Sequence, residues 1–236
     1  MNFQIFYMKS LNIFLTLLCF FIVVCSQSSI IAQDDDSDDD EVYSKIIPKH
    51  SLTVELGMPV SISSKGYKGL MQGIVNVSPY YHYNFKNNLS LGIGGNYSFF
   101  WINHVLAPDT KNIGGIHAVG GFVKVGHEKF HTERLGTDIG IKVGVSQLNF
   151  SSVNNRALGN GVVNQNVFYI EPTLGIVLSA DEFTSYRWIV GYTIQNYTFN
   201  PTQLGFKAAS FSSSDYNKLT QFLTVGFGFT YYFKQH

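Results

Sequence analysis

Residues 223–233 read LTVGFGFTYYF, and every second side chain in this run is large and apolar. The side chains in between are small or polar, apart from Tyr232. Successive side chains of a β-strand point to opposite faces, so this period of two predicts a strand with one apolar face. Seven further segments repeat the pattern, namely 52–58, 75–85, 89–101, 115–127, 137–150, 165–179 and 185–197.

The connections between these eight predicted strands alternate in length. Residues 85–88, 129–136 and 180–184 form tight connections, whereas 103–114, 151–164 and 200–216 are longer and rich in Asn, Ser and Gly. Strands of about 10–15 residues are long enough to cross a bilayer at a tilt, and short turns opposite long polar loops are typical of outer-membrane barrels. The sequence therefore predicts an all-β protein, an eight-stranded antiparallel up-and-down transmembrane β-barrel.

A soluble lipocalin-type barrel, with its apolar face turned inward around a ligand, is the alternative architecture. The second face of the strands is dominated by Gly, Ser, Thr and Asn, which suits a crowded, hydrated interior better than a soluble exterior. Tyr and Trp are also enriched where a bilayer meets water. Aromatic residues of the apolar face gather at strand ends, with Tyr81, Tyr83, Tyr186, Trp188, Tyr231 and Phe233 toward the short turns and Phe99 and Trp101 toward the long loops.

The composition of the 236-residue chain fits the same interpretation. Charged residues make up 14% and the formal net charge is +0, which argues against a basic nucleic-acid-binding protein. The two cysteines, Cys19 and Cys25, both lie in the N-terminal apolar run, so no disulfide framework is expected downstream. We predict a signal peptide over 1–32, an acidic periplasmic linker over 33–49 and the barrel over 50–236.

The N-terminal segments leave several alternatives open. The apolar run from Leu11 follows Lys9 and is short for a membrane helix, as in secretory signal peptides, and cleavage after Ala32 fits the small-residue rule. Met8 is an alternative start, and lipidation of Cys25 is disfavoured by the large Val24 before it. The acidic run at 34–41 predicts a solvated linker, with a calcium-binding or partner-docking tail as the alternative.

A predicted signal peptide, eight amphipathic strands and the closing run FGFTYYF at 227–233 resemble the small OmpA-type outer-membrane β-barrels. The Ala32-Gln33 junction, the Gly-rich strands and the single expected domain make the chain most similar to the PorT-like members of that group. The resemblance covers roughly residues 50–236. It implies insertion by the barrel-assembly machinery, which reads terminal aromatic residues, although here Phe233 is followed by three more residues. It also implies protein partners in a secretion complex.

Charged side chains on the small, polar face are the candidate site. An eight-stranded barrel has a lumen just wide enough for side chains, and buried charges there must pair. We expect Lys142 and Arg187 to flank Glu171 at similar depth, and Glu55 to reach Lys142 or Lys124 across the lumen. The prediction is a structural network that closes the lumen, with a gated proton or ion path as the alternative. Its predicted members are Glu55, His82, Lys124, Lys142, Glu171 and Arg187.

Residues 127–131 read HEKFH and match the H-E-x-x-H motif of zinc proteases, which requires a helix. The preceding residues alternate as a strand, in which the two His would lie about 13 Å apart at ~3.3 Å per residue. We therefore expect a polar periplasmic turn here. None of the seven His is followed two positions later by Ser, the pair that a lipid A deacylase of this size needs. No catalytic residue, metal ligand or cofactor is predicted.

The sequence thus predicts a non-enzymatic outer-membrane barrel, structural or accessory in role, with both termini in the periplasm. The expected partners are outer-membrane lipids and lipopolysaccharide, the barrel-assembly machinery and members of a secretion complex, but no nucleic acid. A lipid A-modifying enzyme and a surface adhesin acting through its long loops are the alternatives that remain open.

Overall fold

The computed structural model describes residues 48–233 except 86, 104–110, 208–211 and 213–215. The predicted signal peptide over 1–32 and most of the predicted acidic linker lie outside the described residues. The helices and strands are β1 (His50–Ser61), α2 (Lys65–Leu70), β2 (Met71–Asn84), β3 (Leu89–Ile102), β4 (Gly114–Phe130), β5 (Leu135–Ser152), α3 (Val153–Ala157), β6 (Val163–Ser179), β7 (Thr184–Thr198), η1 (Pro201–Leu204) and β8 (Leu219–Tyr232). No helix of the described residues is long and apolar enough to cross a membrane.

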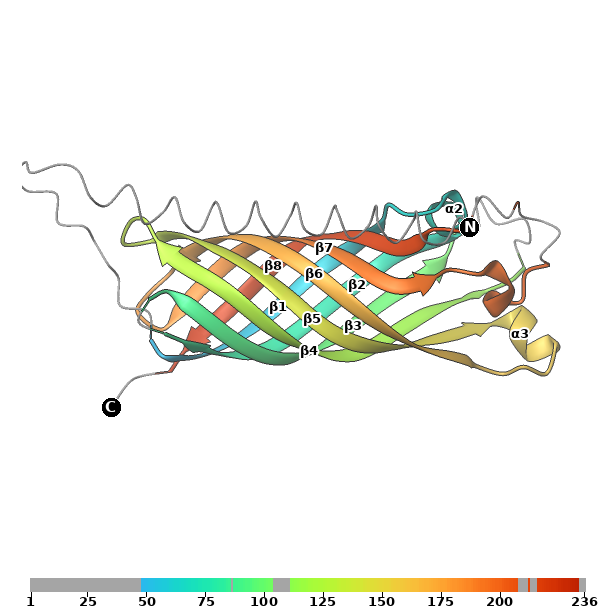
Figure 1. The fold of residues 1–236 in the computed structure, drawn as a ribbon, viewed down its shortest axis with the longest axis horizontal. Coiled ribbons are helices and arrows are strands. Elements are labelled where there is room, and N and C mark those ends of the chain that lie inside the picture. Colours follow the sequence, from blue (N-terminus) through green and yellow to red (C-terminus); the bar gives the residue numbers. More distant parts are fainter. Residues whose placement is uncertain (1–47, 86, 104–110, 208–211, 213–215, 234–236) are drawn as a thin grey trace, which may run out of the picture. The chain divides into compact units, whose positions relative to one another are not determined.

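The eight strands form one closed barrel in which each strand pairs antiparallel with its neighbour in sequence (Figure 1). β1 and β8 close the barrel through a regular register that runs from Ser51 opposite Tyr232 to Ser61 opposite Phe222. The predicted eight-stranded antiparallel up-and-down barrel is confirmed. Most strands are longer than predicted, β1 above all, because its pairing with β8 continues beyond the apolar alternation at 52–58.

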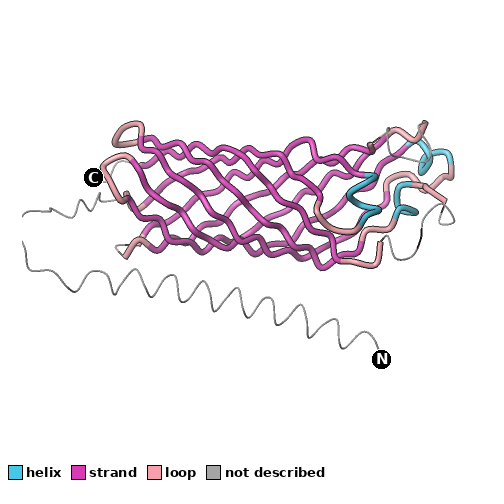
Figure 2. Tube along the Cα trace, turned by 90° about the horizontal axis from the view of Figure 1, so that it is seen from above, coloured by secondary structure: helices cyan, strands magenta, loops and turns pink. Residues whose placement is uncertain are grey.

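The two ends of the barrel differ. The connections 85–88, 131–134 and 180–183 lie at one end, called here the turn end, together with the start of β1 and the end of β8. The other end, the loop end, carries the longer connections and all three short helices (Figure 2). The alternation in the sequence does not predict these helices, although Ser64, Ser152 and Asn200 each cap one of them with a side-chain oxygen.

Over most of the barrel wall, the large apolar residues of the alternating strands point outward. Trp188 is 66% exposed and Ile93 is 65% exposed, whereas the intervening residues of the same strands are mostly buried in the lumen. This orientation is the reverse of the one in the lipocalin-type alternative. We call the outward apolar surface the apolar belt; its members include Leu52, Leu56, Leu91, Ile93, Val123, Val125, Val143, Val145, Phe168, Leu174, Ile176, Trp188, Val190, Val225 and Phe227.

Aromatic pairs follow the belt on the outer surface, as the sequence pattern predicts. Trp188 packs edge-on against Phe227 at a ring-centroid distance of 5.0 Å, and Tyr231 packs against Phe233 at 5.5 Å. Toward the loop end, Phe99 contacts Trp101 at 5.8 Å. Offset and edge-to-face geometries of this kind stabilise aromatic pairs beyond the area that they bury.

Candidate functional site

The half of the lumen toward the turn end contains seven charged side chains, each no more than 4% exposed. They project inward from five different strands, so the network that they form ties together strands that are not neighbours. Removing a charge from water costs several kcal/mol, which only close pairing and hydrogen bonding offset. This charged network consists of Glu55, Lys124, Glu128, Asp138, Lys142, Glu171 and Arg187, with Tyr80 at its centre.

Lys142 is the centre of one group. Its Nζ lies 2.7 Å from Glu55 Oε2 and 3.0 Å from Glu171 Oε1, so one ammonium group bridges two carboxylates. Lys142 and Glu171 are direct register partners on β5 and β6, whereas Glu55 reaches Lys142 from β1. The Thr193 hydroxyl donates to Glu171 at 2.6 Å. The same ammonium lies 5.2 Å from the centre of the Phe122 ring, a favourable cation–π distance.

Asp138 and Arg187 are the centre of the second group. Arg187 places one guanidinium nitrogen 2.7 Å from Asp138 Oδ2 and the other 3.1 Å from Glu128 Oε2. Lys124 also contacts Asp138 Oδ2, at 2.6 Å. The Tyr232 hydroxyl donates to the remaining oxygen of Glu128 at 2.6 Å, so the last residue of β8 is attached to the network.

Tyr80 joins the two groups. Its hydroxyl donates to Glu55 and accepts from Lys124 Nζ at 3.1 Å, so a continuous chain of polar contacts runs along the lumen. The network holds four carboxylates against three cations. Hydroxyl donors from Tyr80, Tyr232 and Thr193 to three of the carboxylates disperse the excess negative charge.

The structure places all six predicted site residues in the lumen, but their partners differ in part from the expectation. Lys142 does contact Glu171 and Glu55. The expected pairing of Arg187 with Glu171 is wrong, because the register places Arg187 opposite Val177, six residues further toward the turn end. His82 is buried beside the network rather than ion-paired; its Nε2 lies 2.9 Å from the Thr53 hydroxyl and its ring lies 4.6 Å from that of Tyr80.

Two members of the network, Glu128 and Asp138, are not among the predicted site residues. Glu128 lies in the HEKFH segment, which was expected to form a polar turn; instead β4 continues to Phe130 and directs Glu128 into the lumen. The signal was present in the alternation, because Glu128 has the same parity as the inward-facing Lys124. Asp138 likewise precedes the outward-facing Ile139 and therefore belongs to the inner face.

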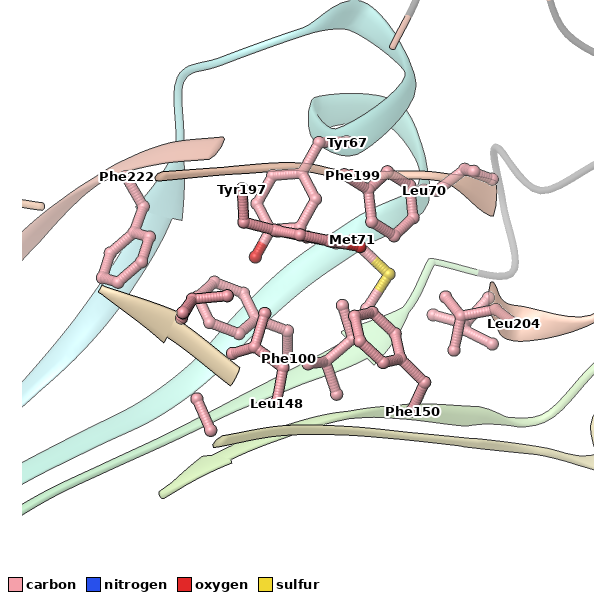
Figure 3. Packing of buried hydrophobic residues seen from close by; sticks show 14 of the residues in the cluster. Tyr67, Leu70, Met71, Phe100, Leu148, Phe150, Tyr197, Phe199, Leu204 and Phe222 are labelled. Carbon is pink, nitrogen blue, oxygen red and sulfur yellow. The ribbon is translucent and has the colours of Figure 1, made fainter. Parts of the chain in front are cut away.

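The half of the lumen toward the loop end is filled by apolar side chains (Figure 3). Phe100 packs edge-on against Phe222 at 5.3 Å, and Tyr67 of α2 packs against Phe199 at 5.0 Å. Burial raises the pKa of the Tyr67 hydroxyl well above its usual value. We call this set the loop-end cluster: Tyr67, Leu70, Met71, Phe100, Ile102, Ile116, Ala118, Leu148, Phe150, Val167, Tyr197, Phe199, Leu204, Phe206 and Phe222.

Buried polar contacts hold the loop-end segments over this cluster. The Leu204 carbonyl of η1 accepts hydrogen bonds from Asn112 Nδ2 and from Ser152 Oγ, both at 2.8 Å. Asn155 of α3 donates to the Gln203 carbonyl at 2.6 Å. These bonds join three connections that are far apart in sequence. Among the described residues, α2, α3, η1 and Asn112 therefore form a packed cap over the loop-end cluster.

The described residues offer little for catalysis or metal binding. The two histidines of the HEKFH segment lie on a strand and in the turn after it, not one turn apart on a helix. Among the described ranges, no group of three or more His, Cys, Asp or Glu is placed to hold a metal ion. The charged side chains of the lumen are instead engaged with one another in ion pairs.

Comparisons with known proteins agree with this fold. No protein-family model matches the chain, and no curated sequence matches it. Neisserial surface protein A (NspA) matches 80% of this chain and 100% of its own, with a TM-score of 0.52 and 9% identity. Two further structures are less similar. The outer membrane protein OprG from Pseudomonas aeruginosa matches 79% of this chain and 98% of its own, with a TM-score of 0.47 and 10% identity. Ail, the attachment invasion locus protein of Yersinia pestis, matches 78% of this chain and 99% of its own, with a TM-score of 0.45 and 11% identity. At these identities the likeness concerns the fold.

Proposed function

We propose that this chain is a non-enzymatic outer-membrane β-barrel with a closed lumen, which acts as a structural component and displays a packed cap at its loop end. One observation carries the proposal. The apolar belt encloses the charged network, and the loop-end cluster fills the other half of the interior. Eight strands enclose a lumen that side chains fill, which leaves no aqueous channel.

In this proposal the belt contacts outer-membrane lipids, the loop end faces the outside of the cell and both termini are periplasmic. Short turns on the periplasmic side and longer loops on the outer side are the usual arrangement of such barrels. The charged network is structural: it crosslinks β1, β4, β5, β6 and β7 across the lumen. Folding would require the barrel-assembly machinery.

Substitutions on the two faces of β5 test the membrane assignment. Val143→Arg places a charge on the belt, where Arg near the midplane costs about 2–4 kcal/mol, and should reduce recovery of heat-modifiable protein from outer-membrane fractions. Ser146→Ala, on the lumen face of the same strand, is the matched control and should behave like the wild type. Equal recovery of both variants would contradict the assignment.

Cysteine labelling tests the orientation. The only native cysteines, Cys19 and Cys25, fall in the predicted signal peptide. With a membrane-impermeant maleimide on intact cells, Lys68→Cys in α2 should label and Glu133→Cys in a turn should not, since both residues are exposed but at opposite ends. The reverse pattern would place the loop end in the periplasm.

Planar-bilayer recordings test the closed lumen. The purified protein should show no stable conductance, because the network and the cluster occupy the interior. Reproducible open-channel steps would favour the gated ion path instead.

The narrower prediction, a PorT-like accessory role in a secretion complex, rests on sequence resemblance alone. Crosslinking in native membranes followed by pull-down tests it, and recovery of secretion components would support it. A surface adhesin is the second candidate. The hydrogen-bonded cap favours it, because a rigid exposed surface suits recognition of a partner.

A further inference from the structure

The faces of the barrel wall exchange character along β5 to β7. From Ile139 to Val145, the outward side chains of β5 are aliphatic and the inward ones are charged or small; beyond Val145, Gln147 and Asn149 face outward while Leu148 and Phe150 are buried inside. β7 changes in the same way, with Asn196 outside and Tyr197 inside. A wall that is polar outside and apolar inside is that of a soluble protein, so this level marks the upper edge of the apolar belt.

Amide side chains gather just above that edge on the β5–β6 hairpin. The register sets Gln147 opposite Asn166 and Asn149 opposite Asn164, which makes a two-by-two block of amides on the outer face. Side chains directly opposite one another lie about 4.5–5.5 Å apart at Cβ. Gln147, Asn164 and Asn166 are exposed, whereas Asn149 is half-buried and donates to the His117 carbonyl at 3.3 Å. Each amide offers both donors and an acceptor, the complement of a sugar hydroxyl.

Cations lie beyond the amides. Arg156 of α3 sits directly past the end of β5, where its Nε contacts the Ser152 carbonyl at 3.5 Å. The described residues of the loop-end connections contain no Asp or Glu, while Asp109 and Asp215 lie outside the described ranges. The connections at the turn end, by contrast, carry Glu133, Asp181 and Glu182. All four loop-end connections present exposed cations, namely Lys65, Lys68, Lys111, Arg156, Lys207 and Lys218.

The cap holds this surface in place. Ser152 is the N-cap residue of α3, and the side chains of Ser152 and Asn155 both donate hydrogen bonds to backbone carbonyls of η1. Amides on paired strands and a cation on a fastened helix lose little conformational freedom when they bind a ligand, so binding costs less entropy than it would on a free loop.

We infer that the outer face of the β5–β6 hairpin above the belt binds the phosphorylated core sugars of the lipopolysaccharide that surrounds the barrel. The inference rests on the proposed function, which sets the loop end in the outer leaflet. Along this one hairpin the aliphatic belt meets acyl chains, the amide block meets sugar hydroxyls and Arg156 meets phosphate. Arg pairs with phosphate through charge-assisted, often bidentate hydrogen bonds.

Reconstitution into phosphatidylcholine nanodiscs tests the inference. Lipopolysaccharide with a phosphorylated core, the same material after dephosphorylation, and lipid A without core are added in parallel, and bound lipid is counted by native mass spectrometry. The wild type should retain core-bearing lipopolysaccharide about tenfold more strongly than either other form, the scale of one hydrogen bond to a charged group. Equal retention of all three forms would overturn the inference.

Two variants localise the effect. Gln147→Ser with Asn166→Ser keeps the face polar but removes one of the two register pairs of amides, and Arg156→Gln removes the cation; each should lose most of the preference. Lys129→Gln with Thr137→Ser, a register pair on the outer face at the turn end, is the control and should retain it. Unchanged preference in both site variants would also overturn the inference. Wild-type protein that folds into the nanodiscs but shows no preference refutes this inference alone, whereas failure to insert refutes the proposed function.

Discussion

The two halves of the lumen are filled by side chains of opposite polarity. Toward the turn end, seven buried charges pair across the barrel, and toward the loop end fifteen apolar residues pack together. Along β5 to β7 the outer wall differs in the opposite sense, with the apolar belt beside the charged half and exposed amides beside the apolar half. Where the outside is apolar, as contact with lipid requires, the interior can be polar; where the outside faces water, burial of apolar side chains must stabilise the wall.

This contrast implies two kinds of sensitivity to mutation. In the charged half, removal of one charged side chain leaves other ions buried without a partner, so the loss of stability depends on how many charges stay unpaired. In the apolar half, a deletion leaves a cavity, so the penalty depends on the volume that is removed.

The largest effect is expected at Lys142, whose Nζ bridges Glu55 and Glu171. Lys142→Met preserves volume but leaves both carboxylates without their cation and should lower the free energy of unfolding by about 3–5 kcal/mol. Urea unfolding in lipid vesicles, followed by heat-modifiable mobility, measures it. Adding Glu55→Gln and Glu171→Gln to Lys142→Met should recover most of the loss, since no unpaired charge remains. A triple variant as unstable as the single one would show that volume, not charge, governs this half.

Leu204 should give the next largest effect. It is fully buried in the loop-end cluster, and Leu204→Ala should cost about 2–4 kcal/mol through lost burial and the remaining cavity. The same unfolding assay applies. Leu158→Ala is the matched control, because Leu158 follows α3 but is 65% exposed and should change stability little. If the two variants unfold alike, the cap is not packed on the cluster as described.

The smallest effect is expected at Ser152, which caps α3 and bonds to the Leu204 carbonyl. Ser152→Ala should lower the free energy of unfolding by about 1 kcal/mol, the usual value of an N-cap, and raise proteolysis at the loop end. Ser151→Ala, one residue earlier and on the outer face, should do neither. Protease cleavage that is identical in both variants would contradict a role of Ser152 in fastening the cap.

Local alternation was enough to predict the strands and their faces. The outward set Leu223, Val225 and Phe227 follows from a period of two, and so does the inward position of Lys142 and Glu171. The same rule would have included Glu128, had the HEKFH segment been interpreted as strand rather than turn.

What the sequence determined by itself is therefore the set of eight strands and the face on which each strand residue lies, since both depend on local spacing along the chain. Only the tertiary structure decided which charges meet. Arg187 pairs with Asp138 and Glu128 rather than Glu171, because depth in the lumen depends on the register between strands. The tertiary structure also determined the packing of the cap. Its Leu204, Asn112 and Ser152 are far apart in sequence, and no local pattern records contacts that form only when the barrel closes.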